Sequence, residues 1–163
     1  MSVSTRERVG NGVTYDDDVA SLYDHDAYGI YRHSHDDLLG LLPDKTHFGR
    51  VLDVGVGTGN FASRVRERFT PDALYGLDPS AAMLTRATEK VPGMIPVHGD
   101  DGALLSDERL RDLDLVLACF VMAYSSPERL VERVRGALKP GGMFATVTTT
   151  LNSFTELLKV AEH

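Results

Sequence analysis

The chain contains 163 residues, 42% of them hydrophobic and 25% charged, a balance typical of one ordinary globular domain. Its net charge of −7 argues against a nucleic acid partner, because an acidic surface repels phosphate. No apolar run approaches roughly 20 residues, residues 1–11 lack the apolar segment of a secretory signal, and Cys119 is the single cysteine, so we expect a cytoplasmic protein without a membrane anchor or an internal disulfide.

The first part of the chain is expected to form an arm and two helices. Residues 1–12 are polar and contain glycine, as loose N-terminal arms do. From Tyr15 to Leu42, apolar side chains recur at a loosely helical spacing that breaks at Gly29, and Pro43 ends the segment. This pattern predicts one helix on each side of Gly29.

Beyond Pro43, short runs rich in valine and leucine alternate with amphipathic stretches, which is typical of a parallel sheet built from βαβ units. The helix after the first run has an apolar stripe of Phe61, Val65 and Phe69, so we expect that face to be buried. Five strands are predicted, at residues 50–54, 73–78, 94–98, 113–119 and 143–148.

The helix after the fourth predicted strand has the clearest boundaries. Ser126 is expected to cap its N-terminus, and Pro127 suits its first position. Gly141 is expected to end it after Lys139. Four apolar side chains are predicted to share its buried face: Leu130, Val131, Val134 and Leu138.

A glycine-rich turn directly follows the first predicted strand, with Asp53 on the strand and Gly55, Gly57 and Gly59 in the turn. Glycine allows the backbone to approach a ligand where side chains would collide, so we expect a ligand at this turn. Turns that bind dinucleotides place a glycine where this chain has Asn60. The turn by itself therefore indicates a ligand without identifying it.

This strand and turn resemble the first motif of the class I S-adenosylmethionine-dependent methyltransferases, which is an acidic residue followed by Gly-x-Gly-x-Gly. The resemblance covers residues 50–148. It implies that S-adenosyl-L-methionine is the cofactor and that the backbone of the turn receives the methionine part. The cofactor-binding residues implied here are Asp53, Gly55, Gly57 and Gly59.

Two acidic positions follow later strands in the order that the family has. Asp78, with Pro79 after it, ends the second strand, where a carboxylate can accept hydrogen bonds from two ribose hydroxyls. NAD-binding folds use the same placement, and a plain surface turn is the alternative. Asp100 and Asp101 follow the third strand, where the resemblance implies an acceptor for the adenine amino group; a solvated turn is the alternative.

The end of the fourth strand borders both the cofactor and the acceptor in the family. Phe120 and Met122 are therefore expected to line the pocket. Many relatives carry a histidine pair where this chain has Ala123 and Tyr124, so Tyr124 either contacts an acceptor or packs in the core. The segment 138–142 resembles the turn before the fifth family strand, and we expect a structural role for it.

The resemblance does not identify catalytic residues, and the candidates are Tyr124 and His33, the latter as a general base. No metal is expected, because the histidines and aspartates of residues 24–37 lack a recognised ligand spacing. In similar enzymes, N-terminal helices form a lid over the cofactor. Four tyrosines belong either to such a lid or to an ordinary core: Tyr15, Tyr23, Tyr28 and Tyr31.

We therefore predict an α/β domain with a doubly wound, mostly parallel sheet. Its parts are an arm and helical lid at 1–43, a Rossmann-like cofactor-binding core at 44–150 and the start of a C-terminal helix at 151–163. Similar enzymes continue with another helix and two more strands, so we expect the fold to lack its last two strands. The exposed edge of the fifth strand would then be available to a second copy of the chain.

The expected function is transfer of a methyl group from S-adenosylmethionine to an oxygen, nitrogen or carbon atom of a small molecule, chiefly by positioning the two reactants. One alternative is a non-catalytic S-adenosylmethionine-binding or assembly module. Another is an NAD-dependent oxidoreductase, which Asn60 and the segments 99–100 and 139–142 disfavour.

Overall fold

The computed structural model describes residues 8–9, 13–14, 24–26, 29–44, 47–122 and 124–149. Two short strands, β1 (Arg8–Val9) and β2 (Val13–Thr14), pair antiparallel where the polar composition predicts a loose arm. Of the two helices expected before Pro43, the structure describes the second, α2 (Ile30–Leu41). The helix expected before Gly29 lies outside the described residues except for a turn at 24–26, and so does the expected C-terminal helix.

The centre of the fold is a five-stranded sheet in which all neighbouring strands run parallel, in the order β5-β4-β3-β6-β7. Its strands are β3 (Arg50–Val54), β4 (Ala73–Asp78), β5 (Ile95–His98), β6 (Leu113–Cys119) and β7 (Leu138–Val147). The predicted doubly wound α/β fold is thereby confirmed. The strand order reverses between β3 and β6, and a crevice is expected at the carboxyl ends of the strands at such a point.

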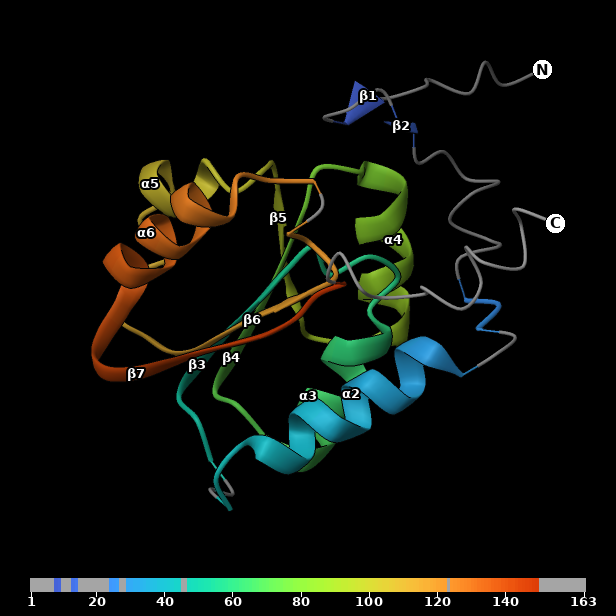
Figure 1. Cartoon of the computed structure of the whole chain (residues 1–163), viewed down its shortest axis with the longest axis horizontal. Helices are drawn as coiled ribbons and strands as arrows, with labels where there is room; N and C mark the ends of the chain where they lie inside the picture. The colour runs from blue at the N-terminus through green and yellow to red at the C-terminus, as the bar shows by residue number, and fades with distance from the viewer. Residues whose placement is uncertain are drawn as a thin grey trace, which may run out of the picture.

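Helices cover both faces of this sheet (Figure 1). On one face lie α2, α3 (Asn60–Phe69) and α4 (Ala81–Lys90), and on the other lie α5 (Ala103–Ser106) and α6 (Pro127–Ala137). The apolar stripe predicted for α3 is buried, in the hydrophobic core on the α2, α3 and α4 face of the sheet. None of the helices in the described ranges is long and apolar enough to cross a membrane.

The junction between α6 and β7 differs from the sequence expectation. The helix ends at Ala137, and Leu138 already belongs to the strand, so Gly141 does not end the helix. Leu138 pairs with Leu113 and Met143 pairs with Leu115, so the segment between Leu138 and Met143 bulges out of the ladder. This bulge is the structural role of the segment 138–142.

An ion pair fixes this bulge to the neighbouring strands. The Lys139 ammonium pairs with the carboxylate of Asp114 at the start of β6. The same carboxylate accepts a hydrogen bond from the backbone N–H of Arg50 on β3 at 2.8 Å. Asp114 therefore ties three strands together at the end of the sheet opposite the crevice.

The start of α6 also corrects two predictions. Ser126 occupies the N-cap position, but its side chain does not cap the helix; its hydroxyl donates to the Glu128 carboxylate at 2.9 Å. Val131 is 47% exposed and so does not share the buried face. Leu130 and Val134 are buried as predicted, and Ala137 joins them.

Candidate cofactor-binding site

The glycine-rich turn begins where β3 ends and leads into α3. Its three glycines have φ angles of 69°, 54° and 83° at Gly55, Gly57 and Gly59, in the left-handed region that favours glycine. A Cβ atom on Gly55 would lie 2.4 Å from Cγ2 of Val121, so a side chain there would also collide with the loop after β6. The N–H group of Gly55 donates to the Leu77 carbonyl at 2.7 Å, which holds the turn beside the end of β4.

Asp78 ends β4 and faces the turn. Its Oδ2 accepts the N–H of Gly57 and its Oδ1 accepts the N–H of Ser80, both at 2.9 Å. Burial raises the pKa of Asp78, although the amides of Ser80 and Gly57 and the nearby His98 act in the opposite direction. Each oxygen of a carboxylate accepts more than one hydrogen bond, so this oriented group can still accept from a ligand.

A first cavity of about 200 Å³ opens at the carboxyl ends of β3, β4, β5 and β6. It brings together most of the residues that the sequence singles out: Gly55, Gly57, Asp78, Pro79, Asp100, Asp101, Phe120 and Tyr124. Its apolar walls include side chains that the sequence reasoning missed: Val54, Leu77, Met83 and Val121. These are apolar residues at the ends of predicted elements, and no motif distinguishes them from core residues.

A second cavity of about 40 Å³ lies on the other side of the turn. Asp53 of β3, Thr58 of the turn and Asn60 at the start of α3 line it. Tyr31 and His35 line it from α2. Four residues line both cavities, so the cavities adjoin: Gly55, Gly57, Cys119 and Phe120.

Asp53 gives the second cavity an unusual electrostatic character. It is 2% exposed, and its Oδ2 atom has no hydrogen-bond partner in the described part of the chain. Burial raises the pKa of this carboxyl to about 8, and the negative charge of Asp78 adds to the effect. Because an unpartnered buried oxygen is costly, this site fits a ligand that carries a hydrogen-bond donor or a positive charge.

The two neighbouring acidic residues after β5 have different surroundings. Asp100 is exposed at the cavity, where its Oδ1 accepts the N–H of Gly102 at 2.7 Å. Asp101 pairs with Arg133 of α6 at 2.8 Å and accepts a hydrogen bond from the Ser125 hydroxyl at 3.1 Å. The carboxylate of Asp101 is therefore engaged in joining the loop after β5 to α6, whereas Asp100 faces the cavity.

Three of the sequence candidates lie away from the cavities. Gly59 lines neither of them; a Cβ atom there would lie 3.0 Å from the Cα of Ala87, so this glycine allows α3 to pack against α4. Met122 is partly buried against the hydrophobic core on the α5 and α6 face of the sheet, and Val121 lines the cavity in its place. Phe120 has a φ angle of 60°, so the alternation of the strand does not continue past it.

The third candidate that lies away from the cavities is His33, which is exposed on α2 and lines neither cavity. His35 lies in the second cavity instead, where it stacks on Phe61 with ring centroids 4.4 Å apart. Burial lowers its pKa to about 4, so the ring is neutral at physiological pH. The helical spacing from His35 to Leu38 and Leu39 is the sequence signal that could have found it.

Of the four tyrosines considered for a lid, the structure describes Tyr31. Its ring meets that of Phe120 edge to face, with centroids 5.0 Å apart. Tyr31 therefore forms part of the wall that α2 contributes to the second cavity. The other three tyrosines lie outside the described residues.

Comparisons with known proteins agree with this geometry. Residues 52–144 match the model of the methyltransferase domain family. The chain is 35% identical over 111 residues to trans-aconitate 2-methyltransferase of Rhizobium etli, which covers 67% of this chain and 41% of the relative. It is 31% identical over 147 residues to malonyl-[acyl-carrier protein] O-methyltransferase of Haemophilus ducreyi, which covers 85% and 55%.

A solved structure shows the same fold. The S-adenosylmethionine dependent methyltransferase from Mesorhizobium loti superposes with a TM-score of 0.58 at 30% identity, covering 69% of this chain and 51% of that one. The chain thus spans about half the length of the relatives it matches. Because the family model matches more than half of the chain, including the carboxyl ends of the strands that border the first cavity, the chain belongs to the methyltransferase domain family, in which S-adenosylmethionine is the cofactor.

Proposed function

We propose that this chain binds S-adenosylmethionine across the two adjoining cavities and transfers its methyl group to a small molecule. The observation that carries this proposal is the division of the site by the glycine-rich turn, with Asp78 in the first cavity and Asp53 in the second. The cofactor has a ribose with two hydroxyls at one end and a cationic amino acid at the other. One carboxylate is available for each.

In the first cavity, Asp78 accepts hydrogen bonds from the ribose hydroxyls, since its orientation is already fixed by two backbone amides. Asp100 accepts from the adenine amino group. Phe120 lines both cavities and so borders the point where the two halves of the cofactor join. In the second cavity, the unpartnered Oδ2 of Asp53 receives the ammonium group of the methionine part. Burial raises the pKa of Asp53 to about 8 in the free protein, so this carboxyl releases its proton when the cation binds.

We further propose a carboxylate oxygen as the methyl acceptor. The two relatives above are both named for substrates that carry a carboxylic acid: trans-aconitate in one and a malonyl group in the other. A carboxylic acid is ionised at neutral pH, so it attacks without a general base. Tyr124, which is 51% exposed at the cavity, is then not required as a base.

When bound, the cofactor supplies an electrophilic methyl group on a sulfonium ion. The protein's contribution is then to hold the acceptor in line with that group and to exclude water. The apolar walls of the first cavity, with Met83, Val121 and Phe120, serve this purpose. Acceptor specificity is set by the residues that border Phe120 and Tyr124.

The experiment is a transfer assay with radiolabelled S-adenosylmethionine and a panel of small carboxylic acids and malonyl thioesters. We expect acceptor-dependent labelling, which Asp78→Ala abolishes and which the variant Asp107→Asn, away from both cavities, retains. A folded protein that binds the cofactor but labels no acceptor would instead support the non-catalytic module.

A further inference from the structure

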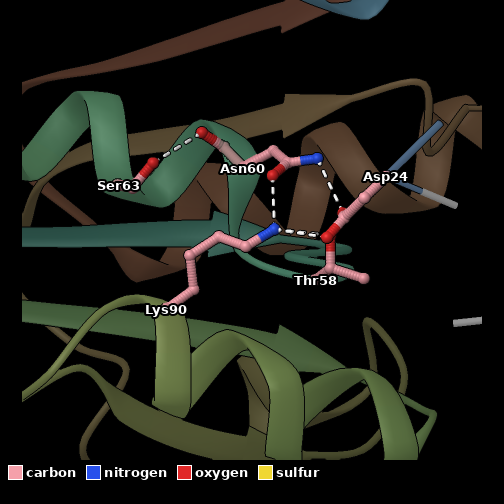
Figure 2. A network of polar contacts seen from close by, with 5 residues as sticks. All are labelled: Asp24, Thr58, Asn60, Ser63 and Lys90. Atoms are coloured by element: carbon pink, nitrogen blue, oxygen red, sulfur yellow. Dashed lines mark hydrogen bonds and ion pairs between the residues drawn. The ribbon is translucent and has the colours of Figure 1, made fainter. Parts of the chain in front are cut away.

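A cluster of four polar side chains joins the N-terminal segment to the glycine-rich turn (Figure 2). The Asp24 carboxylate accepts hydrogen bonds from the Thr58 hydroxyl and, at 2.9 Å, from the Asn60 amide. The Lys90 ammonium lies 2.7 Å from Asp24 Oδ2 and 2.5 Å from Asn60 Oδ1. We call these residues the Asp24 cluster: Asp24, Thr58, Asn60 and Lys90.

The cluster occupies a favourable electrostatic position. Helix α3 begins at Asn60 without a side-chain cap from Gly59 and without an acidic residue in its first turn, so its positive end lacks a local anion. Asp24 supplies a negative charge there from a distant part of the chain. Lys90, in the last turn of α4, stands at the negative end of that helix.

The ionised form of Asp24 is the stable one in this setting. Burial alone would raise its pKa, but hydrogen bonds from Lys90, Thr58 and Asn60 together with the charge of Lys90 lower it below the ordinary value. Thr58 is 1% exposed, so its hydroxyl depends on Asp24 as an acceptor. Asp24 is therefore the shared acceptor for the Thr58 hydroxyl, the Asn60 amide and the Lys90 ammonium.

Two residues further along, Asp26 connects the cluster to α2. The Oδ2 atom of Asp26 accepts the backbone N–H of Arg32 in the first turn of α2 at 2.9 Å, and its carbonyl accepts the N–H of Gly29 at 3.0 Å. These bonds supply the cap that Gly29 lacks. The same helix contributes Tyr31 and His35 to the second cavity. The position of this wall therefore depends on where Asp24 is anchored.

We propose that Asp24 is a positioning residue for the cofactor: it holds α2 against the glycine-rich turn and so encloses the second cavity around the amino-acid end of S-adenosylmethionine. This inference rests on the proposed function. It adds that the contribution of Asp24 to affinity is confined to ligands that reach the second cavity. Ligands that occupy only the first cavity gain nothing from it.

The test compares two ligands by calorimetric titration of the full chain. S-adenosylhomocysteine fills both cavities, whereas 5′-methylthioadenosine lacks the amino-acid end. The side chains of Lys90 and Asp24 are 30% and 39% exposed, so solvent weakens the ion pair, and we expect Asp24→Asn to raise the Kd of S-adenosylhomocysteine about fivefold to tenfold. The Kd of 5′-methylthioadenosine should not change.

The matched control is Asp44→Asn. It removes one negative charge from the same N-terminal part of the chain, where Asp44 pairs at 3.6 Å with Arg68 away from the turn. We expect both Kd values to remain those of the wild type. A second variant, Lys90→Met, keeps the hydrogen bonds from Thr58 and Asn60 to Asp24 and should raise the Kd of S-adenosylhomocysteine about threefold.

Each other outcome is informative. Unchanged binding of S-adenosylhomocysteine by Asp24→Asn, or an equal loss for both ligands, overturns the positioning role. If Asp24→Asn does not fold, as judged by circular dichroism, Lys90→Met decides by the same criterion. Failure of the wild type to bind either ligand overturns the proposed function itself, and with it this inference.

Discussion

Replacement of Asp53 by asparagine is expected to stabilise the free protein at alkaline pH while weakening cofactor binding. The Asp53 carboxyl is buried with an unpartnered oxygen, and its pKa is raised from 3.8 to about 8. In the unfolded chain this group is ionised above about pH 4, whereas in the folded chain it stays protonated until about pH 8. The unfolded state therefore binds fewer protons, and the free energy of unfolding falls as the pH rises through this interval.

The size of the effect follows from proton linkage. A difference of one bound proton changes the free energy of unfolding by about 1.4 kcal/mol per pH unit. The lowered pKa of His35, about 4, acts in the opposite direction below about pH 6.5, so the clean window is about pH 6.5 to 8. Over this window the wild type should lose about 2 kcal/mol relative to Asp53→Asn, or about 4 to 8 °C in Tm.

The assay is urea denaturation followed by far-ultraviolet circular dichroism, because the chain has no tryptophan. Asp107→Asn is the control: its pKa is lowered by Arg109, so it titrates below the window and should behave as the wild type does. Titration with S-adenosylhomocysteine should give a Kd about tenfold higher for Asp53→Asn. Parallel curves of unfolding free energy against pH for the wild type and Asp53→Asn would refute the assignment of a protonated, unpartnered carboxyl.

Three other substitutions separate packing from ligand contact. Gly55→Ala should reduce the free energy of unfolding by about 2 to 4 kcal/mol in urea denaturation, because the new methyl group collides with Val121 and the backbone is left-handed; a neutral effect would contradict the turn geometry. Asp101→Ala should cost about 1 to 3 kcal/mol, since it leaves Arg133 without this carboxylate, with little change in the Kd of 5′-methylthioadenosine. Asp100→Asn should raise the Kd of 5′-methylthioadenosine about tenfold and leave the free energy of unfolding unchanged. If the two variants behave alike, Asp100 and Asp101 do not have the separate ligand-binding and structural roles assigned to them.

The strands β3, β4 and β6 were predictable because they are buried on both faces. Such strands appear in the sequence as continuous apolar runs, and the predicted bounds of β3, β4 and β6 match the structure. The start of β7 was not predictable in the same way. Leu138 completes a helical spacing with Val134 as well as it begins a strand, and only pairing with Leu113 decides between the two.

The cofactor site likewise has features that the sequence predicts and features that it does not. Backbone requirements are visible in the sequence, so the glycine-rich turn and Asp78 could be predicted to lie together, and both line the first cavity. Side-chain partners are not visible, because they depend on residues far away in the chain. Asp24 meets Lys90 across 66 positions, and Asp101 is engaged by Arg133 of a later helix.

The most direct test of the account is calorimetric titration of the full chain with S-adenosylmethionine and, separately, with NAD, repeated on Asp78→Ala. We predict saturable binding of S-adenosylmethionine, no binding of NAD, and a Kd at least about tenfold higher in the variant, because it loses charged hydrogen bonds to the ribose. Binding of NAD, or binding of S-adenosylmethionine that Asp78→Ala leaves unchanged, would contradict the assignment of the two cavities.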